Sequence, residues 1–250
     1  MRQLLPTAPD DITMEALDLI YANDARPRPA TRPWILSNMI VSTDGATAIG
    51  GRSGQLGGPA DWRAFHALRA VADVIMVGAG TARAEHYGPP KVTEEQQARR
   101  VARGQAPVPR IALITGRLDL DLGSALFVDS PVRPLVFTGT RPSADQLAAA
   151  SEVADVIIAG TDNVDLVAAT VALHDLGVNI VLSEGGPTLN GHLAEADLFD
   201  EKCVTIAPLL VGGSAPRSVH DADLAHPLDL RLDRVIEDGG MLLLRYVRAN

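Results

Sequence analysis

Two short glycine-containing segments each follow an apolar run and precede a stretch of helical pattern. The first is Gly78-Ala79-Gly80-Thr81, and the second is Glu184-Gly185-Gly186-Pro187-Thr188. Glycines between a strand and a helix leave backbone N–H groups unobstructed at the positive end of the helix dipole, which favours phosphate binding. Because the carboxyl ends of parallel strands lie on one rim of a sheet, we expect both turns to meet a single extended ligand that carries phosphates.

Neighbouring polar side chains make phosphate binding the better interpretation of these turns. Either turn alone is more typical of a tight strand-to-helix connection, and the first lacks the third glycine of the G-x-G-x-x-G pattern. Thr81 and Thr188 add hydroxyl groups, and Arg83 adds a guanidinium. Because arginine pairs bidentately with phosphates, Arg83 suits the 2′-phosphate of NADPH; the alternative is a solvated helix residue.

Three acids are candidates for substrate or proton handling. Asp44 follows the apolar segment 34–41 and precedes a glycine-rich loop at 50–58, where a substrate-orienting or proton-handling carboxylate would sit. Asp-Gly is also a common turn former, which is the alternative for Asp44. Glu184 ends an apolar strand, where an acid is costly unless it is paired or lies at the rim. The position of Asp61 alone indicates an N-terminal helix residue stabilised by the helix dipole.

The remaining reactive side chains indicate neither a metal site nor covalent catalysis. No two histidines stand at metal-ligand spacing, and the single cysteine, Cys203, has no evident catalytic partner. No G-x-S-x-G nucleophile elbow occurs. We therefore expect no metal, and a chemistry in which a bound cofactor reacts while the protein supplies orientation and electrostatics.

The composition indicates one globular protein that binds a small molecule. The 250 residues are 46% apolar and 21% charged, which is ordinary for a folded protein. A net charge of −9 argues against nucleic acid and anionic membranes as partners. Since no export signal and no run of 18 apolar residues occurs, and a lone cysteine excludes an internal disulfide, we expect a cytoplasmic protein.

Strand-like and helix-like segments alternate through the main part of the chain and must position the turns and acids. Repeated alternation predicts an α/β fold, with a largely parallel sheet covered by helices on both faces. The predicted strands are 34–41, 73–77, 110–115, 134–139, 155–160, 179–186 and 202–208, and the predicted helices are 59–72, 94–103, 143–150, 164–176 and 187–196.

Local signals place the helix starts and close the sheet with a hairpin. Pro59 and Pro187 suit a first helical turn. Thr93 and Ser143, each followed three residues later by Gln, match capping boxes. Strand-like arms around Asp238-Gly239-Gly240 predict a C-terminal antiparallel hairpin, so the sheet should be mixed.

The first 33 residues differ from the rest in pattern. An amphipathic helix is predicted over 10–23, which opens with aspartates suited to capping. The segment 25–33 is rich in proline and arginine and is predicted to be an extended connector. We therefore expect an N-terminal helix and connector over 1–33 and the main domain over 34–250.

Four motifs occur together in a fixed order. They are SNMIVSTDGATA (37–48), HALRAVADVIMVGAGTARAE (66–85), VLSEGGPTLNGHL (181–193) and TIAPLLVGG (205–213). Together they closely resemble the pyrimidine reductase domain of riboflavin biosynthesis, a branch of the dihydrofolate reductase-like superfamily. The resemblance implies a mixed sheet of that type, a homodimer and NADPH bound across the glycine turns. It also implies hydride transfer from NADPH to the ribosyl C1′ of 5-amino-6-(5-phosphoribosylamino)uracil, which gives the ribityl form.

The resemblance also assigns roles to individual residues. It places Ser53, Arg69 and Glu184 where the family contacts substrate, and Asp44 beside the reacting centre, so Asp44 and Glu184 are the predicted catalytic residues. Asn38 and Asp61 complete the predicted substrate contacts. The predicted cofactor contacts, from the turns and the resemblance together, are Ser42, Gly78, Gly80, Thr81, Arg83, Gly185, Gly186, Pro187, Thr188 and Leu210.

Two departures from the family pattern leave alternatives for the substrate. Ala46 stands where many members have Lys or Arg, and AEHYGPP (84–90) replaces the D-D-P-x-L-x-x-R stretch that helps to seat the ribityl phosphate. One alternative is reduction of a pterin such as dihydrofolate, whose amino and ring nitrogens Asp61 or Asp44 would bind. Others are an NADPH-binding protein that has lost turnover and an α/β protein whose glycine turns are purely structural.

Overall fold

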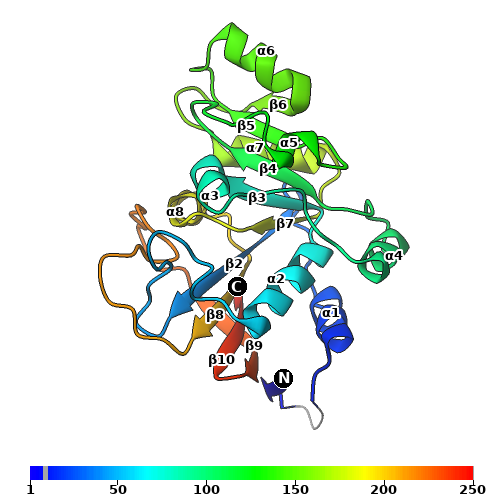
Figure 1. Cartoon of the computed structure of the whole chain (residues 1–250), viewed down its shortest axis with the longest axis vertical. Helices are drawn as coiled ribbons and strands as arrows, with labels where there is room; N and C mark the ends of the chain where they lie inside the picture. Colours follow the sequence, from blue (N-terminus) through cyan, green and yellow to red (C-terminus); the bar gives the residue numbers. More distant parts are fainter. Residues whose placement is uncertain (8–10, 250) are drawn as a thin grey trace.

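The computed structural model describes residues 1–7 and 11–249, which form one ten-stranded sheet with helices on both faces (Figure 1). The strand order is β1-β9-β10-β8-β2-β7-β3-β4-β5-β6. The strands are β1 (Arg2–Leu5), β2 (Trp34–Ser42), β3 (Val74–Gly78), β4 (Arg110–Ile114), β5 (Leu135–Thr138), β6 (Asp155–Ile158), β7 (Ile180–Ser183), β8 (Glu201–Ala207), β9 (Leu230–Asp238) and β10 (Met241–Arg248). The helices are α1 (Met14–Ala22), α2 (Pro59–Val71), α3 (Ala79–Ala84), α4 (Glu94–Ala102), α5 (Ala125–Val128), α6 (Ala144–Val153), α7 (Leu166–Asp175) and α8 (Pro187–Glu195).

Most of the sheet is parallel, and one edge is antiparallel. The strands from β8 to β6 in the sheet order pair in parallel. β10, β9 and β1 extend the sheet with antiparallel pairs. Parallel strands need crossover connections, and the alternating helices supply them. The fold class predicted from the sequence is therefore confirmed, including the C-terminal hairpin.

Two apolar layers hold the helices on the sheet. On one face Leu17 of α1 and Leu68 of α2 are fully buried against the strands. On the other face Leu173 of α7 and Leu193 of α8 pack in the same way. Each buried leucine contributes about 2 kcal/mol of hydrophobic stabilisation, which fixes the strand ends that carry the turns. No helix within residues 1–7 and 11–249 is long and apolar enough to cross a membrane.

The local signals in the sequence are borne out at the helix starts. Thr93 and Ser143 each form a reciprocal capping box with the glutamine three residues later. Pro59 and Pro187 lie in the first turns of α2 and α8. In the β9–β10 hairpin, Gly239 and Gly240 both have positive φ angles, the backbone that a two-residue hairpin turn requires.

The N-terminal segment departs from the prediction in detail. Helix α1 begins at Met14, and the side chain of Thr13 caps it rather than an aspartate. The predicted cap at Asp10 lies outside the described residues. β1 was not expected, and it pairs with β9 at the edge of the sheet. A domain boundary at residue 34 stays a prediction.

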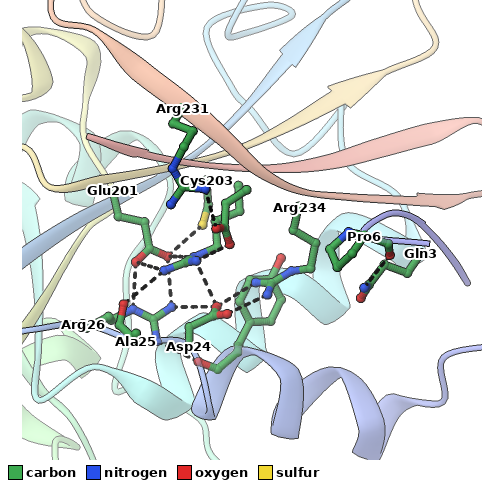
Figure 2. Close-up of polar contacts among 12 residues, drawn as sticks. Gln3, Pro6, Asp24, Ala25, Arg26, Glu201, Cys203, Arg231 and Arg234 are labelled. Atoms are coloured by element: carbon green, nitrogen blue, oxygen red, sulfur yellow. Dashed lines mark hydrogen bonds and ion pairs between the residues drawn. The ribbon is translucent and has the colours of Figure 1, made fainter. Parts of the chain in front are cut away.

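A buried group of charged side chains ties the N-terminal segment to the antiparallel end of the sheet (Figure 2). Arg26 donates to both carboxylate oxygens of Glu201 at 2.9 Å, and Arg245 donates to them at 2.9 and 3.1 Å. Arg234 pairs with Asp24 at 2.6 and 2.7 Å. Burial raises the pKa of Glu201, but the charges and hydrogen bonds of Arg26 and Arg245 more than offset this and lower it to about 2. These five residues form what we call the arm cluster.

Candidate active site

The two glycine turns lie side by side at the carboxyl ends of neighbouring strands. β3 and β7 pair in parallel, with Met76 opposite Ser183. Just beyond them the Gly78 amide donates to the Gly185 carbonyl oxygen at 2.7 Å. The prediction that both turns share one rim of the sheet is therefore confirmed.

Gly186 and Thr81 bring the two turns into direct contact. A Cβ atom on Gly186 would lie 2.4 Å from Thr81 Oγ1, so a larger residue would force the Thr81 side chain or the turn to shift. Gly186 is also the N-cap of α8 and makes no side-chain cap hydrogen bond, and a Cβ on Gly80 would meet open space. A helix start without a side-chain cap leaves N–H groups for a ligand. The residues present thus fit the phosphates of a nicotinamide cofactor.

A cavity of about 680 Å³ opens beside the turns. Its walls come from β2, the first half of α2, the loop at 47–58, α3 with the segment after it, and the second glycine turn. This volume lies in the range of small-molecule sites, and we call it the main cavity. The predicted site residues that line it are Asn38, Ser53, Asp61, Thr81, Glu184, Gly186 and Pro187.

Asp61 lies in the first turn of α2 and faces the main cavity. Burial raises its pKa above the ordinary aspartate value, and a hydrogen bond with the Thr205 side chain of β8 opposes part of the rise. A raised pKa keeps more of the carboxyl group protonated than in a solvated aspartate, so Asp61 can donate as well as accept. The helix dipole accounts for an acid at this position but not for its burial.

Glu184 lines the main cavity from the second glycine turn, with a side chain that is 3% exposed. Arg69 Nε and Nη2 donate to its two carboxylate oxygens, both at 2.7 Å, and the Tyr87 hydroxyl donates to Oε2 at 2.6 Å. The Arg69 guanidinium lies 4.0 Å from the centre of the Phe65 ring. Burial lowers the pKa of Arg69, and the charge and hydrogen bonds of Glu184 more than offset it. The arrangement is a buried ion pair with one face on a cavity.

A second hollow of about 670 Å³ adjoins the main cavity and shares Tyr87 and Glu85 with it. Arg69 and Lys91 bring positive charge to this second hollow. Burial and then the Arg69 charge lower the pKa of His66. The two spaces share lining residues, so the positive charge of the second hollow lies next to the main cavity.

Asp44 lies outside the main cavity, on an exposed turn. Its carboxylate accepts hydrogen bonds from Ser42 Oγ at 2.5 Å, Gly212 N at 2.7 Å and Val211 N at 3.1 Å. The bonds from Ser42, Gly212 and Val211, in that order, lower its pKa to about 2. Asp44 is thus ionised at neutral pH and holds the loop after β8. This position matches the turn-forming alternative, and its catalytic role stays a prediction.

The other predicted cofactor residues lie beyond the wall of the main cavity. Arg83 Nη1 donates to the Asp119 carbonyl oxygen, and its side chain is half exposed. Thr188 Oγ1 lies 3.3 Å from Asp221 Oδ2, and Leu210 is 84% exposed. Seven predicted cofactor contacts do not line the main cavity, and their role stays a prediction. They are Ser42, Gly78, Gly80, Arg83, Gly185, Thr188 and Leu210.

Tyr87 is a cavity residue that the sequence analysis missed. Beyond the end of α3, Tyr87 N–H donates to the Ala82 carbonyl at 2.9 Å and His86 N–H to the Arg83 carbonyl at 3.3 Å. His86 has a φ of 52°. These bonds define a Schellman motif, in which glycine usually takes the left-handed position. Because a histidine takes the position where glycine is usual, the sequence does not signal the end of α3 or the turn that directs Tyr87 inward.

Comparison with known proteins agrees with this geometry. The RibD C-terminal domain family model matches residues 33–244. The 2,5-diamino-6-ribosylamino-4(3H)-pyrimidinone 5′-phosphate reductase of Methanothermobacter thermautotrophicus is 31% identical over 86% of this chain and 98% of that protein. The crystal structure of a pyrimidine reductase-like protein from Corynebacterium diphtheriae has a TM-score of 0.83 and 27% identity, covering 94% of this chain and 99% of that chain.

A more distant solved structure shares the fold. The riboflavin biosynthesis reductase of Saccharomyces cerevisiae has a TM-score of 0.67 at 19% identity, and covers 92% of this chain and 97% of that chain. The family model spans most of the described sheet, including both glycine turns and Glu184. The chain therefore belongs to the RibD C-terminal domain family and is an oxidoreductase of the pyrimidine reductase type.

Proposed function

We propose that this protein is an NADPH-dependent reductase that converts 5-amino-6-(5-phosphoribosylamino)uracil to its ribityl form. The observation that carries the proposal is the contact between the two glycine turns beside a cavity that holds Glu184 and Asp61. Family membership supports the class of reaction. The relative from Methanothermobacter is named for a pyrimidinone that bears a 2-amino group, so this compound is the second pyrimidine to be assayed.

The chain's own residues divide into a cofactor end and a substrate end. NADPH, when bound, supplies the hydride. Thr81, Gly186 and the start of α8 would hold its phosphates, because they combine open backbone amides with a hydroxyl. Asn38, Asp61 and Glu184 offer the amide and carboxyl groups that pair with the amino and carbonyl groups of a pyrimidine.

The second hollow supports a substrate with a phosphate. This chain lacks the basic residue after S-x-D-G and the D-D-P-x-L-x-x-R stretch, yet Lys91 and Arg69 place positive charge beside the main cavity. Lys91 is exposed and free to move toward a phosphate, whereas Arg69 is held by Glu184. The predicted substrate contact of Ser53 fits the same region, because Ser53 lines both spaces.

The test is steady-state oxidation of NADPH by purified protein. The two pyrimidines are offered separately, with NADH in parallel, and the ribityl product is identified by mass spectrometry. Turnover of 5-amino-6-(5-phosphoribosylamino)uracil supports the proposal, and turnover of the 2-amino pyrimidinone alone would make that compound the substrate instead. Binding of NADPH without oxidation on either pyrimidine or dihydrofolate would identify a protein that has lost turnover, and no binding in a fluorescence titration would leave the glycine turns with a structural role.

Reduction of dihydrofolate is a second candidate, and the burial of Asp61 favours it. A buried carboxyl group whose pKa is raised can pair with an amino group and with a ring nitrogen of a pterin. Dihydrofolate offered in the same assay decides between the two. A kcat/KM for dihydrofolate above that for both pyrimidines would replace the first candidate with the second.

We also propose a homodimer located in the cytoplasm. The dimer follows from the resemblance to riboflavin-pathway reductases, and the location from the single cysteine. Light scattering coupled to size-exclusion chromatography checks the first, with a mass near twice 26.4 kDa expected. Fractionation of the source cells checks the second.

A further inference from the structure

The side chain of Tyr87 combines an apolar ring with a hydroxyl group that contacts a buried acid. The ring packs against the buried layer that contains Ala82 and Leu68. The hydroxyl donates to Glu184 Oε2 at 2.6 Å. A phenylalanine would fill the same space, so packing explains the ring and leaves the hydroxyl to be explained by Glu184.

The hydrogen bond from Tyr87 completes a set of three donors on the Glu184 carboxylate. Arg69 occupies one position on each oxygen at 2.7 Å, and Tyr87 adds a second on Oε2. The donors come from α2 and from the segment after α3, while Glu184 belongs to the turn after β7. Each carboxylate oxygen has two lone pairs. Three of four acceptor positions are therefore filled by the protein, and the fourth, on Oε1, is left for a ligand.

Tyr87 is a constant donor in this arrangement. Burial, followed by the negative charge of Glu184, raises its pKa well above the ordinary tyrosine value. The hydroxyl therefore stays protonated throughout the range in which the folded protein works, and Glu184 is its acceptor. The Schellman motif at His86 fixes the backbone from which the ring enters, so the direction of the hydroxyl is set before any ligand binds.

We infer that Tyr87 is a positioning residue of the reductase, whose hydroxyl together with Arg69 orients the Glu184 carboxylate toward the substrate in the main cavity. The inference rests on the proposed function and adds to it a residue that the family motifs in this sequence do not contain. Tyr87 acts through Glu184, so its loss should affect the substrate end of the site. The cofactor end is formed by Thr81, which lies on the first glycine turn, and by Gly186, which lies at the start of α8.

The first experiment reads the contact without any catalytic assay. The chain has three tyrosines, so labelling with tyrosine carrying ¹³C at Cζ gives a simple spectrum in which the Tyr87 signal is the one missing from Y87F. We expect Glu184→Gln to shift the Tyr87 signal and to leave that of Tyr246 in place. An unmoved Tyr87 signal overturns the inference, whatever the activity of the protein. The Y87F variant serves only to assign the Tyr87 signal.

The second experiment is a double-mutant cycle on the pyrimidine that the wild type reduces. We expect Y87F to lower kcat/KM about tenfold, E184Q about a hundredfold, and the double variant no further than E184Q, because Tyr87 acts only through Glu184. The KM for NADPH should stay within about twofold of the wild type in Y87F. Tyr246→Phe is the matched control, since Tyr246 lies on β10 away from both the main cavity and the second hollow.

Each outcome of the cycle decides the matter. Losses that multiply to about a thousandfold in the double variant, or a Y87F enzyme with wild-type kinetics, overturn the positioning role. A wild type that oxidises NADPH with neither pyrimidine nor dihydrofolate shows instead that the proposed function fails, and the positioning role falls with it. The melting temperature of Y87F, compared with Y246F, separates a loss of folding from a loss of orientation.

Discussion

Two groups of buried arginines and carboxylates occur in this protein, and they differ in what they touch. In the arm cluster, Glu201 is fully enclosed and accepts hydrogen bonds from Arg26 and Arg245. In the other group, Glu184 is also almost enclosed and accepts hydrogen bonds from Arg69, but one side faces the main cavity. Residue types, burial and hydrogen-bond lengths are similar. Asp24 and Arg234 at the edge of the arm cluster line a separate hollow of about 740 Å³, but Glu201 itself lines none of the cavities found among the described residues, whereas Glu184 lines the main cavity.

A buried charge is a sign of function only when part of its hydrogen-bonding capacity is left for a ligand. The arm cluster surrounds Glu201 with guanidinium groups, and its atoms serve to join the N-terminal segment to β8 and β10. The desolvation of buried ion pairs offsets much of their attraction, so they contribute to the specificity of the structure more than to the free energy of unfolding. Around Glu184 the same chemistry fixes an acid at the rim where the glycine turns meet.

The largest effect is expected for Glu201→Gln, which leaves Arg26 and Arg245 buried with one negative charge fewer. The free energy of unfolding should fall by about 3–5 kcal/mol at pH 7, measured by urea denaturation. Turnover at a temperature where the variant is folded should stay close to that of the wild type. A folded variant without turnover would show that the arm cluster also takes part in function, and would contradict the difference drawn between the two groups.

The stability of the arm cluster should also depend on pH. The pKa of Glu201 is lowered to about 2 in the folded state, so its contribution to stability is present above the unfolded pKa near 4.5 and is lost as the pH falls toward 2. Wild-type stability should decline over this interval more steeply than that of Glu201→Gln. Equal slopes for the two proteins would contradict the assignment.

The matched change in the second group is Glu184→Gln. It should lower kcat/KM for the reduced substrate about a hundredfold, since a charged hydrogen bond is worth about 1.5–3 kcal/mol. The loss of stability should be smaller than for Glu201→Gln, because Arg69 lines the second hollow, where water can solvate it. Stopped assays and urea titrations on the same preparation measure both quantities, and a reversed order of stability loss would count against the comparison.

Asp61→Asn should lower activity less than Glu184→Gln does. The dependence of stability on pH should have the opposite sign to that of Glu201. We expect kcat/KM to fall about tenfold, as for the loss of one hydrogen bond to a charged group. Because the folded pKa of Asp61 is raised, the wild type loses stability as the pH rises through that pKa, and the asparagine variant does not. At pH 7 the variant should be at least as stable as the wild type. Denaturation at pH 4 and pH 7 tests the sign.

The smallest effect is expected for Arg83→Ala, outside both groups. If Arg83 binds the 2′-phosphate of NADPH, the KM for NADPH should rise about fivefold and that for NADH should not change, since an exposed ion pair is worth at most about 1 kcal/mol. The Arg83 side chain lies beside Asp119, so the variant also loses that contact. Equal changes for the two cofactors would leave Asp119 as its partner and remove it from the site.

The sequence predicted the site best where function depends on backbone geometry. The turns at Gly78 and Gly185 could be predicted because a glycine between a strand and a helix reflects a local requirement of the backbone, and strand order brought the two turns together. The catalytic role of Asp44 stays a prediction, since an acid after a strand has the same sequence pattern whether it faces a ligand or holds a loop. Tyr87 was missed because nothing in AEHYGPP signals a helix end with histidine in a left-handed conformation.

Periodicity, proline and glycine positions, and capping pairs are local properties, and the sequence by itself determined the alternating elements, the mixed sheet and the rim on which Gly78 and Gly185 meet. Tertiary structure alone decided which acids face a cavity. Glu184 and Glu201 each stand at one end of a strand, yet Glu184 borders the main cavity and Glu201 is held by arginines from distant segments. The physical reason is that solvation and hydrogen-bond partners depend on residues far apart in sequence, which packing brings together.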